Sequence, residues 1–151
     1  MPRVQVEETV DVPRDALFAV LADHARYDRF PGVVGSELVR EGTTERDGLG
    51  ALRRINLGIS VLEEEIVAYD APNSFEYLIT KVRPLPVNHI LGRVEFFDEG
   101  PARTRVVWVS EFEIPLPIVG GFVGRRAASQ FTRAFRTAIR VAAKLSLPQA
   151  A

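Results

Sequence analysis

The chain has 151 residues, a net charge of −1 and no cysteine, and 46% of its residues are hydrophobic. This length suits a single domain over 1–151 with a sizeable core, and the balanced charge argues against a nucleic-acid partner. The lack of cysteine excludes disulfides and fits a cytoplasmic location, while no signal-peptide pattern and no apolar run of roughly 18 residues for a membrane-spanning segment are found.

The first elements in chain order are a strand and two short helices. Apolar and polar residues alternate over 4–12, which predicts a strand. Pro13 suits the first position of a helix, and Asp15 in the first turn favours the helix dipole. Asp23 can cap a second short helix, which residues 30–32 (Phe-Pro-Gly) should end.

Beyond Gly35 the hydrophobic pattern has a period of two, which is typical of strands separated by turns rich in glycine and proline. We expect strands at 35–41, 50–57, 60–69, 74–82, 88–97 and 103–114. The period then becomes helical, and 119–147 predicts one long helix. Its apolar face should hold Phe131, Ala134, Phe135, Ala138, Ile139, Ala142 and Leu145.

This order of elements predicts an α+β fold, in which a curved antiparallel sheet of about seven strands wraps around the long C-terminal helix. One helix cannot cover so many strands completely. The space left between helix and sheet would form a pocket for a small, largely apolar ligand. Phe131 and Phe135 would line this pocket from the helix.

Two opposite charges fall on an otherwise apolar face of the central hairpin. Gly58 and Ile59 suit a two-residue loop with glycine first, and this register places Arg53 directly opposite Glu64. Burying either charge alone would cost several kcal/mol, so we hypothesise an ion pair inside the pocket. It could anchor a ligand carbonyl or hydroxyl, or act in acid-base chemistry. The alternative is an exposed cross-strand pair worth about 0.2–1 kcal/mol.

The same alternation suggests four more pocket residues with polar tips: Tyr77, Asn88, Trp108 and Ser110. Tyr77 and Trp108 could equally be core residues whose polar atoms find internal partners. Phe122, together with Ile118 and Val119, could form an apolar lid at the pocket mouth, or simply a contact at the start of the helix.

The two histidines of the chain suggest no catalytic motif and no metal site. We expect His24 at the surface or in a helix cap, and His89 on the outer face with Arg93. Two separate histidines and no cysteine argue against zinc, and no cofactor motif is present.

The helix cations are Arg125, Arg126, Arg133, Arg136, Arg140 and Lys144. They could meet an acidic partner, an anionic lipid surface or a phosphate, or form a solvated face whose late cations suit the helix C-terminus.

The chain resembles the START-like superfamily, also called SRPBCC, and within it the polyketide cyclase/dehydrase-like branch of small bacterial proteins. Residues 8–13 (Glu-Thr-Val-Asp-Val-Pro) through 17–23 resemble the opening strand and helix pair, with Tyr27 and 30–32 following. The segments 48–53, 64–66 and 69–72 are similar to the central hairpin, and 104–108 to a later strand. The resemblance implies a helix-grip fold with a deep cavity.

Three functions fit these expectations. The first is binding or carriage of a small hydrophobic molecule, such as a polyketide, lipid or quinone. The second is a polyketide cyclase, aromatase or dehydratase, in which Arg53 polarises a carbonyl and Glu64 or Tyr77 moves a proton. A pKa of Glu64 lowered by its salt bridge would count against the second. The third is a chaperone-like interaction module, and a homodimer is compatible with each.

Overall fold

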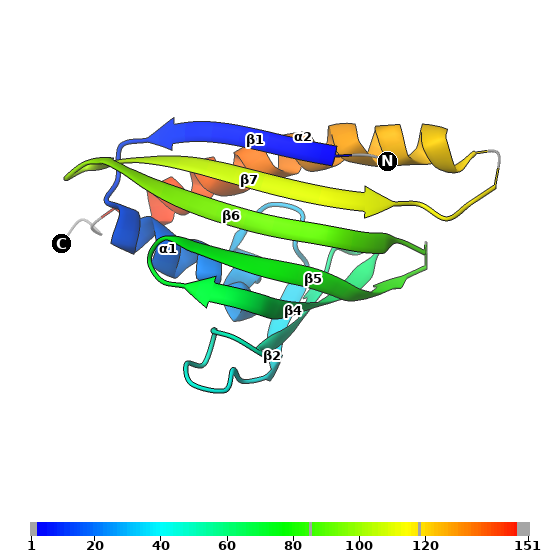
Figure 1. The fold of residues 1–151 in the computed structure, drawn as a ribbon, viewed down its shortest axis with the longest axis horizontal. Helices are drawn as coiled ribbons and strands as arrows, with labels where there is room; N and C mark the ends of the chain where they lie inside the picture. The colour runs from blue at the N-terminus through cyan, green and yellow to red at the C-terminus, as the bar shows by residue number, and fades with distance from the viewer. Residues whose placement is uncertain (1–2, 85, 118, 148–151) are drawn as a thin grey trace.

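The computed structural model describes residues 3–84, 86–117 and 119–147. Seven strands form one antiparallel sheet in the order β1-β7-β6-β5-β4-β3-β2. They are β1 (Arg3–Val10), β2 (Gly35–Arg40), β3 (Leu52–Asn56), β4 (Val61–Asp70), β5 (Ser74–Arg83), β6 (Asn88–Gly100) and β7 (Arg103–Glu113). The curved sheet and the helix that crosses it are shown in Figure 1. The fold expected from the hydrophobic pattern is confirmed.

Two short helices, α1 (Arg14–Ala22) and the 3-10 helix η1 (His24–Arg29), connect β1 to β2. Pro13 lies immediately before α1 with φ at −63°, so it precedes the first helical residue instead of occupying it. Asp23 precedes η1, but its side chain makes no capping hydrogen bond. Its carboxylate instead approaches Arg46 at 3.5 Å and Arg29 at 3.9 Å.

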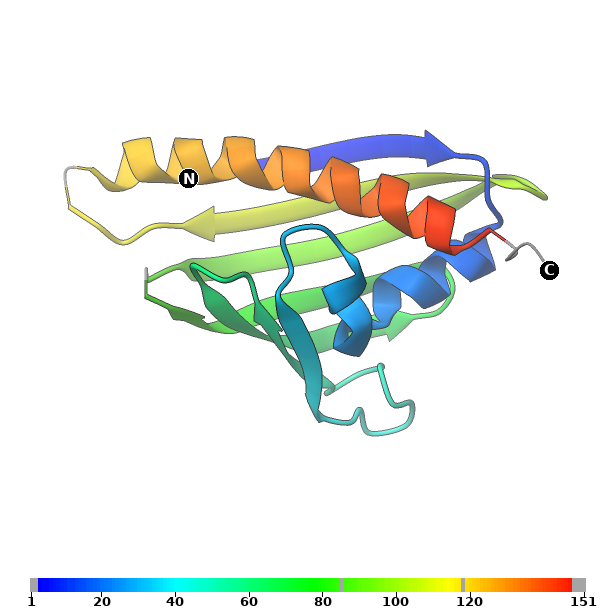
Figure 2. The same ribbon diagram turned by 180° about the vertical axis from the view of Figure 1, so that it is seen from behind.

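The long helix α2 (Gly120–Leu145) lies along one face of the sheet and packs on β1, β7 and α1 (Figure 2). Ile139 and Ala142 are fully buried there. Ala134, expected on the apolar face, is exposed because it lies at the margin of that stripe. The helix α2 covers the part of the sheet formed by β1 and β7. Several inward-facing hydrophobic residues farther from this edge of the sheet are therefore only half-buried: Leu57, Leu62, Ile79 and Val87.

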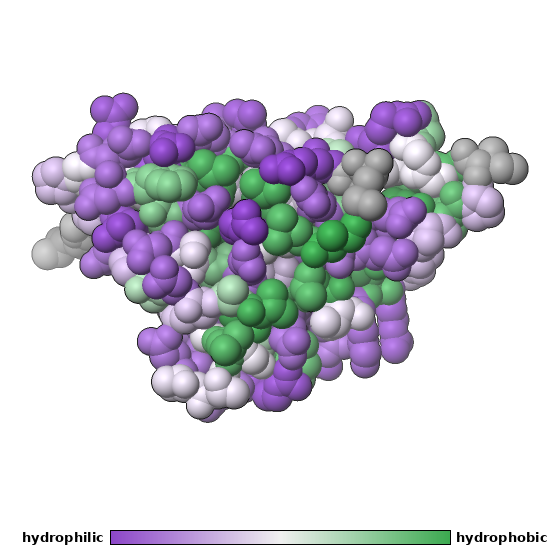
Figure 3. All heavy atoms as spheres, in the orientation of Figure 1, coloured by the Kyte–Doolittle hydropathy of each residue, from purple (hydrophilic) through white to green (hydrophobic). Residues whose placement is uncertain are grey.

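The outer face of the sheet mixes hydrophilic and hydrophobic side chains, and hydrophobic ones gather in a band across the strands (Figure 3). The exposed hydrophobic residues of the strands are Val39, Val67, Ile90 and Phe97. The inner face is apolar by contrast, as the alternation of β7 illustrates. Its inward residues Thr104, Val106, Trp108, Ser110 and Phe112 are all buried, as the period of two predicts.

The β3–β4 hairpin has the register that the sequence predicts. Gly58 has φ of +85°, and Leu57 donates its backbone N–H to the Ser60 carbonyl at 2.7 Å. Glycine adopts this left-handed conformation without a steric penalty, so the turn can stay tight. Arg53 is thereby paired with Glu64 across the two strands.

Candidate functional site

The Arg53–Glu64 ion pair is buried at the inner face of the β3–β4 hairpin. Arg53 Nη2 donates to Glu64 Oε1 at 2.9 Å, and the two residues are 1% and 8% exposed. The exposed cross-strand alternative is therefore wrong. A buried pair of this kind stabilises the fold only when its remaining donors and acceptors are satisfied.

The Arg53 guanidinium has donors left over. Its Nε and Nη1 are buried, and neither has a hydrogen-bond partner among the described residues. A buried donor without a partner costs about 1–3 kcal/mol, and native proteins contain few of them. These two nitrogens carry three N–H donors between them, which could donate to an acceptor from outside the chain.

Electrostatics at Glu64 differ from the sequence expectation. Burial raises the pKa of the Glu64 carboxyl above its usual range, and the neighbouring Arg53 opposes this shift without cancelling it. The expectation that the salt bridge would lower the pKa of Glu64 is wrong, because the sequence does not reveal how completely the carboxyl is removed from water. A lowered pKa would have made Glu64 a poor proton donor, and the raised pKa removes this objection.

Two aromatic rings from η1 border the ion pair. The Tyr27 hydroxyl donates to the Leu21 carbonyl at 2.6 Å, and the His24 ring stacks on Tyr27 with centroids 4.4 Å apart. Burial raises the pKa of Tyr27, and the nearby carboxylate of Glu64 raises it further. Burial lowers the pKa of His24, and the positive charge of Arg53 lowers it further. The hydrophobic pattern assigns Tyr27 no role in the site, and only the family resemblance includes it.

His24 is 2% exposed, so its predicted surface position is wrong. Its Nδ1 donates to the Ala22 carbonyl at 2.9 Å, which satisfies that ring nitrogen inside the core. The spacing of three residues between His24 and Tyr27 is the signal that could have found both, because it places them on one side of a helical turn.

An aromatic series joins the sheet to α2. The Trp108 indole Nε1–H donates to the Tyr77 hydroxyl at 2.8 Å, and Phe135 stacks on Trp108 with centroids 4.2 Å apart. Phe131 continues the stack, with its centroid 6.0 Å from that of Phe135. Burial raises the pKa of Tyr77, so this phenol stays protonated. Tyr77 and Trp108 thus have the internal partners expected of core residues, while their rings also face the interior.

His89 and Asn88 are placed opposite to the sequence expectation. A register shift between His89 and Leu91 bulges β6 at Ile90 and reverses the alternation. His89 therefore turns inward and stacks on Tyr77 with centroids 5.4 Å apart, while Asn88 is exposed. A bulge of one residue leaves no mark in the hydrophobic pattern, so alternation alone could not find it.

His89 and Ser110 contact each other, but they do not form a nucleophile with its base. The Ile79 backbone N–H donates to His89 Nδ1 at 2.9 Å, so the ring proton is on Nε2, which lies 3.2 Å from Ser110 Oγ. A nitrogen that donates to a hydroxyl cannot remove its proton. Burial also lowers the pKa of His89 to about 4, which keeps the ring neutral at neutral pH.

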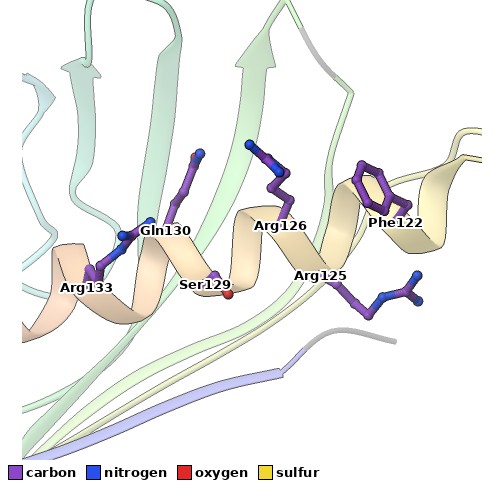
Figure 4. A pocket seen from close by; sticks show the side chains of 6 residues that line it. All are labelled: Phe122, Arg125, Arg126, Ser129, Gln130 and Arg133. Atoms are coloured by element: carbon purple, nitrogen blue, oxygen red, sulfur yellow. The ribbon is translucent and has the colours of Figure 1, made fainter.

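A hollow of about 420 Å³ lies along α2, apart from Arg53. It is lined by Phe122, Arg125, Arg126, Ser129, Gln130 and Arg133. Figure 4 shows Phe122, Arg126 and Gln130 projecting from the same side of the helix, while Arg125 points to the other side. Phe122 is 61% exposed, so it forms part of a surface and does not plug the interior. Ile118, which the lid hypothesis includes, lies outside the described residues.

Within the parts of the chain that the structure describes, no group of three or more histidine or acidic side chains is placed to hold a metal ion. None of the described helices is both long enough and apolar enough to cross a membrane.

A curved seven-stranded antiparallel sheet, closed on one side by a long C-terminal helix, defines a START-like helix-grip protein. The chain belongs to the family described as polyketide cyclase/dehydrase and lipid transport, whose model matches residues 1–145. No curated protein matches the chain.

Solved structures with the same fold come from several organisms. The Zhui aromatase/cyclase from Streptomyces sp. R1128 has a TM-score of 0.77 at 20% identity, with 96% of this chain and 93% of that chain covered. A START superfamily protein from Mycobacterium smegmatis has a TM-score of 0.75 at 14% identity, covering 95% and 98%. A ginseng major latex-like protein has a TM-score of 0.71 at 16% identity, covering 97% and 98%.

Proposed function

We propose that the chain binds a small hydrophobic molecule that carries an oxygen acceptor, and that Arg53 holds this oxygen between the sheet and α2. The observation that supports the proposal most directly is the pair of buried, unpartnered donors at Arg53 Nε and Nη1. A carbonyl or hydroxyl oxygen of the ligand would satisfy them, which offsets the cost of their burial.

The charge of the site favours a neutral ligand oxygen over an anion. Arg53 is already paired with Glu64, so the pair has no net charge while Glu64 is ionised. A ligand carboxylate would bring a second negative charge close to Glu64, and like charges in a buried site are costly. A ketone, ester or phenol oxygen avoids that repulsion.

The walls of the proposed site suit an apolar body. Leu57, Leu62 and Ile79 are inward-facing but only half-buried, and the stack of Trp108 on Phe135 lies on the α2 side. Apolar surface removed from water contributes about 25 cal/mol per Å², so a ligand that covers these residues gains affinity from them. The oxygen contact then supplies orientation.

Fluorescent titration with a matched pair of probes tests this function. Trp108 is the single tryptophan of the chain, so its emission reports on the interior directly. We expect 2-acetylnaphthalene to bind at least several-fold more tightly than 2-ethylnaphthalene, which has the same apolar body without the carbonyl. The charge-neutral double variant Arg53→Met/Glu64→Met should bind both probes equally, since it keeps the apolar walls.

Equal affinities in the native chain, or a carbonyl preference that persists in the double variant, would contradict the proposed anchor. Native mass spectrometry of the chain purified from its own host is the complementary measurement. A carrier should retain a bound small molecule there, and the mass of that molecule would give its chemical class.

Catalysis in the same interior is the second candidate, and the raised pKa of Glu64 favours it. A carboxyl with this pKa, next to a guanidinium that can polarise a carbonyl, has the elements of a proton-transfer site for cyclisation or dehydration. Turnover that is abolished in Glu64→Gln, with probe binding unchanged, would favour catalysis. Unchanged turnover in that variant would exclude Glu64 as the acid.

A further inference from the structure

All charged residues of the helix α2 are cationic. It carries no aspartate or glutamate, although the whole chain has a net charge of −1. Its cations are Arg125, Arg126, Arg133, Arg136, Arg140 and Lys144. The rest of the chain therefore has a net negative charge, and α2 is a wholly cationic element on the surface of the molecule.

Structural roles account for only some of these cations. Arg136 and Arg140 contact Glu8 of β1 at 3.4 and 3.1 Å, which ties the helix to the sheet. For Arg125, Arg126 and Arg133, the described part of the chain provides no ion pair. Arg125 and Arg126 lie in the second turn of α2, far from the C-terminal turn in which the helix dipole stabilises cations. Helix stability therefore does not explain them.

Exposed hydrophobic side chains lie at the end of the molecule where α2 begins. Phe122 and Val119, at the start of α2, are 61% and 50% exposed. Ile59, in the β3–β4 turn, is 90% exposed, and the neighbouring Val34 is 70% exposed. Both views of the ribbon place the β3–β4 turn and the start of α2 toward this end (Figures 1 and 2).

We infer that this end of the molecule docks on the surface of an anionic lipid membrane. Phe122 and Ile59 insert among the lipid chains, and the hollow lined by Arg126, Arg133 and Ser129 receives a lipid phosphate. Clustered cations beside protruding apolar residues are the combination that binds peripheral proteins to anionic bilayers. The inference goes beyond ligand binding and does not depend on it.

A membrane fits this surface better than an acidic protein does. Phe122 and Ile59 are exposed on two separate segments, a helix start and a hairpin turn. A fluid bilayer can bury protruding side chains at independent positions. A folded partner would need a matching cavity for each, because interface cores are closely packed.

Co-sedimentation with vesicles tests the docking surface. We expect the native chain to bind phosphatidylcholine vesicles that contain one quarter phosphatidylglycerol, and to bind pure phosphatidylcholine vesicles much more weakly. Salt should weaken binding, because it screens the attraction between arginines and phosphates. No binding to the anionic vesicles at low salt would overturn the inference.

Matched variants separate this surface from general charge attraction. Arg126→Gln/Arg133→Gln should lower the partition coefficient by roughly thirtyfold, because each of the two cations contributes about 1 kcal/mol near the membrane surface. The control Arg26→Gln/Arg103→Gln removes the same charge from exposed positions outside α2 and should change binding much less. Equal losses in the two double variants would overturn the inference.

The apolar contact has its own control. Phe122→Ser should lower partitioning several-fold, whereas Leu147→Ser, which removes a side chain 51% exposed beyond the other end of α2, should not. Unchanged binding in Phe122→Ser would overturn insertion.

Unfolding midpoints of all variants should match the native chain, since each altered side chain is exposed. Binding of an acidic protein by a chain that ignores anionic vesicles would assign the surface to a protein partner and overturn docking.

Discussion

The Trp108 indole on β7 reaches over β6 to donate its Nε1–H to the Tyr77 hydroxyl on β5, 2.8 Å away. The strand between them carries Gly92 at this position, and Gly92 pairs with Tyr77 on one side and Ser110 on the other. The Tyr77 ring lies directly over Gly92, because a Cβ there would be 2.4 Å from Tyr77 Cζ. The missing side chain of one glycine thus allows two aromatic residues on separate strands to meet.

Gly92→Ala should therefore displace the Tyr77 ring and break its contact with Trp108. Overpacking of this kind costs about 1–3 kcal/mol, and we expect that loss in urea unfolding together with a shift in the Trp108 emission. Gly35→Ala is the matched control, since no atom lies within 4 Å of a Cβ at that strand position. A Gly92→Ala variant as stable as Gly35→Ala would contradict the close approach.

Tyr77→Phe should leave the ring in place and remove the acceptor of the Trp108 N–H. A buried indole N–H without a partner costs about 1–3 kcal/mol. Urea unfolding of the variant measures the cost. Tyr69→Phe, at a half-buried tyrosine, should cost less than about 0.5 kcal/mol, and similar losses in the two variants would argue against the bond.

Arg53→Gln should destabilise the chain because it leaves Glu64 buried without its cation. At pH 7 we expect a loss of about 3–5 kcal/mol and a further rise in the pKa of Glu64, measurable by carbon-13 NMR titration. A carboxyl whose folded pKa lies above its unfolded value stabilises the fold only when it is protonated. The deficit of the variant should therefore shrink as the pH falls toward the unfolded pKa of about 4.5. A deficit that stays constant with pH would contradict burial of the pair.

His89 should make the fold less stable in mild acid. Its folded pKa is about 4 against an ordinary value of 6.5, so the unfolded chain takes up a proton that the native ring refuses in this range. Stability should fall as the pH decreases from 6.5 toward 4. In His89→Gln the loss between pH 7 and pH 5 should be smaller by about 1–2 kcal/mol. Parallel profiles for the two chains would show that the ring is solvated.

Much of the architecture could be predicted from the hydrophobic pattern. The periods of two and 3.6 residues gave the seven strands and the long helix, and Gly58 gave the hairpin register that pairs Arg53 with Glu64. These are local properties, since a strand or helix shows its period within one turn or a few residues. The register of one hairpin is local as well, because its loop length determines it.

The tertiary structure alone decided how completely each inward polar group is removed from water, and it decided the positions of the two histidines. Alternation placed His89 outside and Asn88 inside, and a single bulge at Ile90 reversed both. His24 and the pKa direction of Glu64 depended on how several distant elements pack together. Burial is the sum of contacts from segments that are remote in sequence, so a chain read locally specifies its strands and helices but not the solvation of a side chain between them.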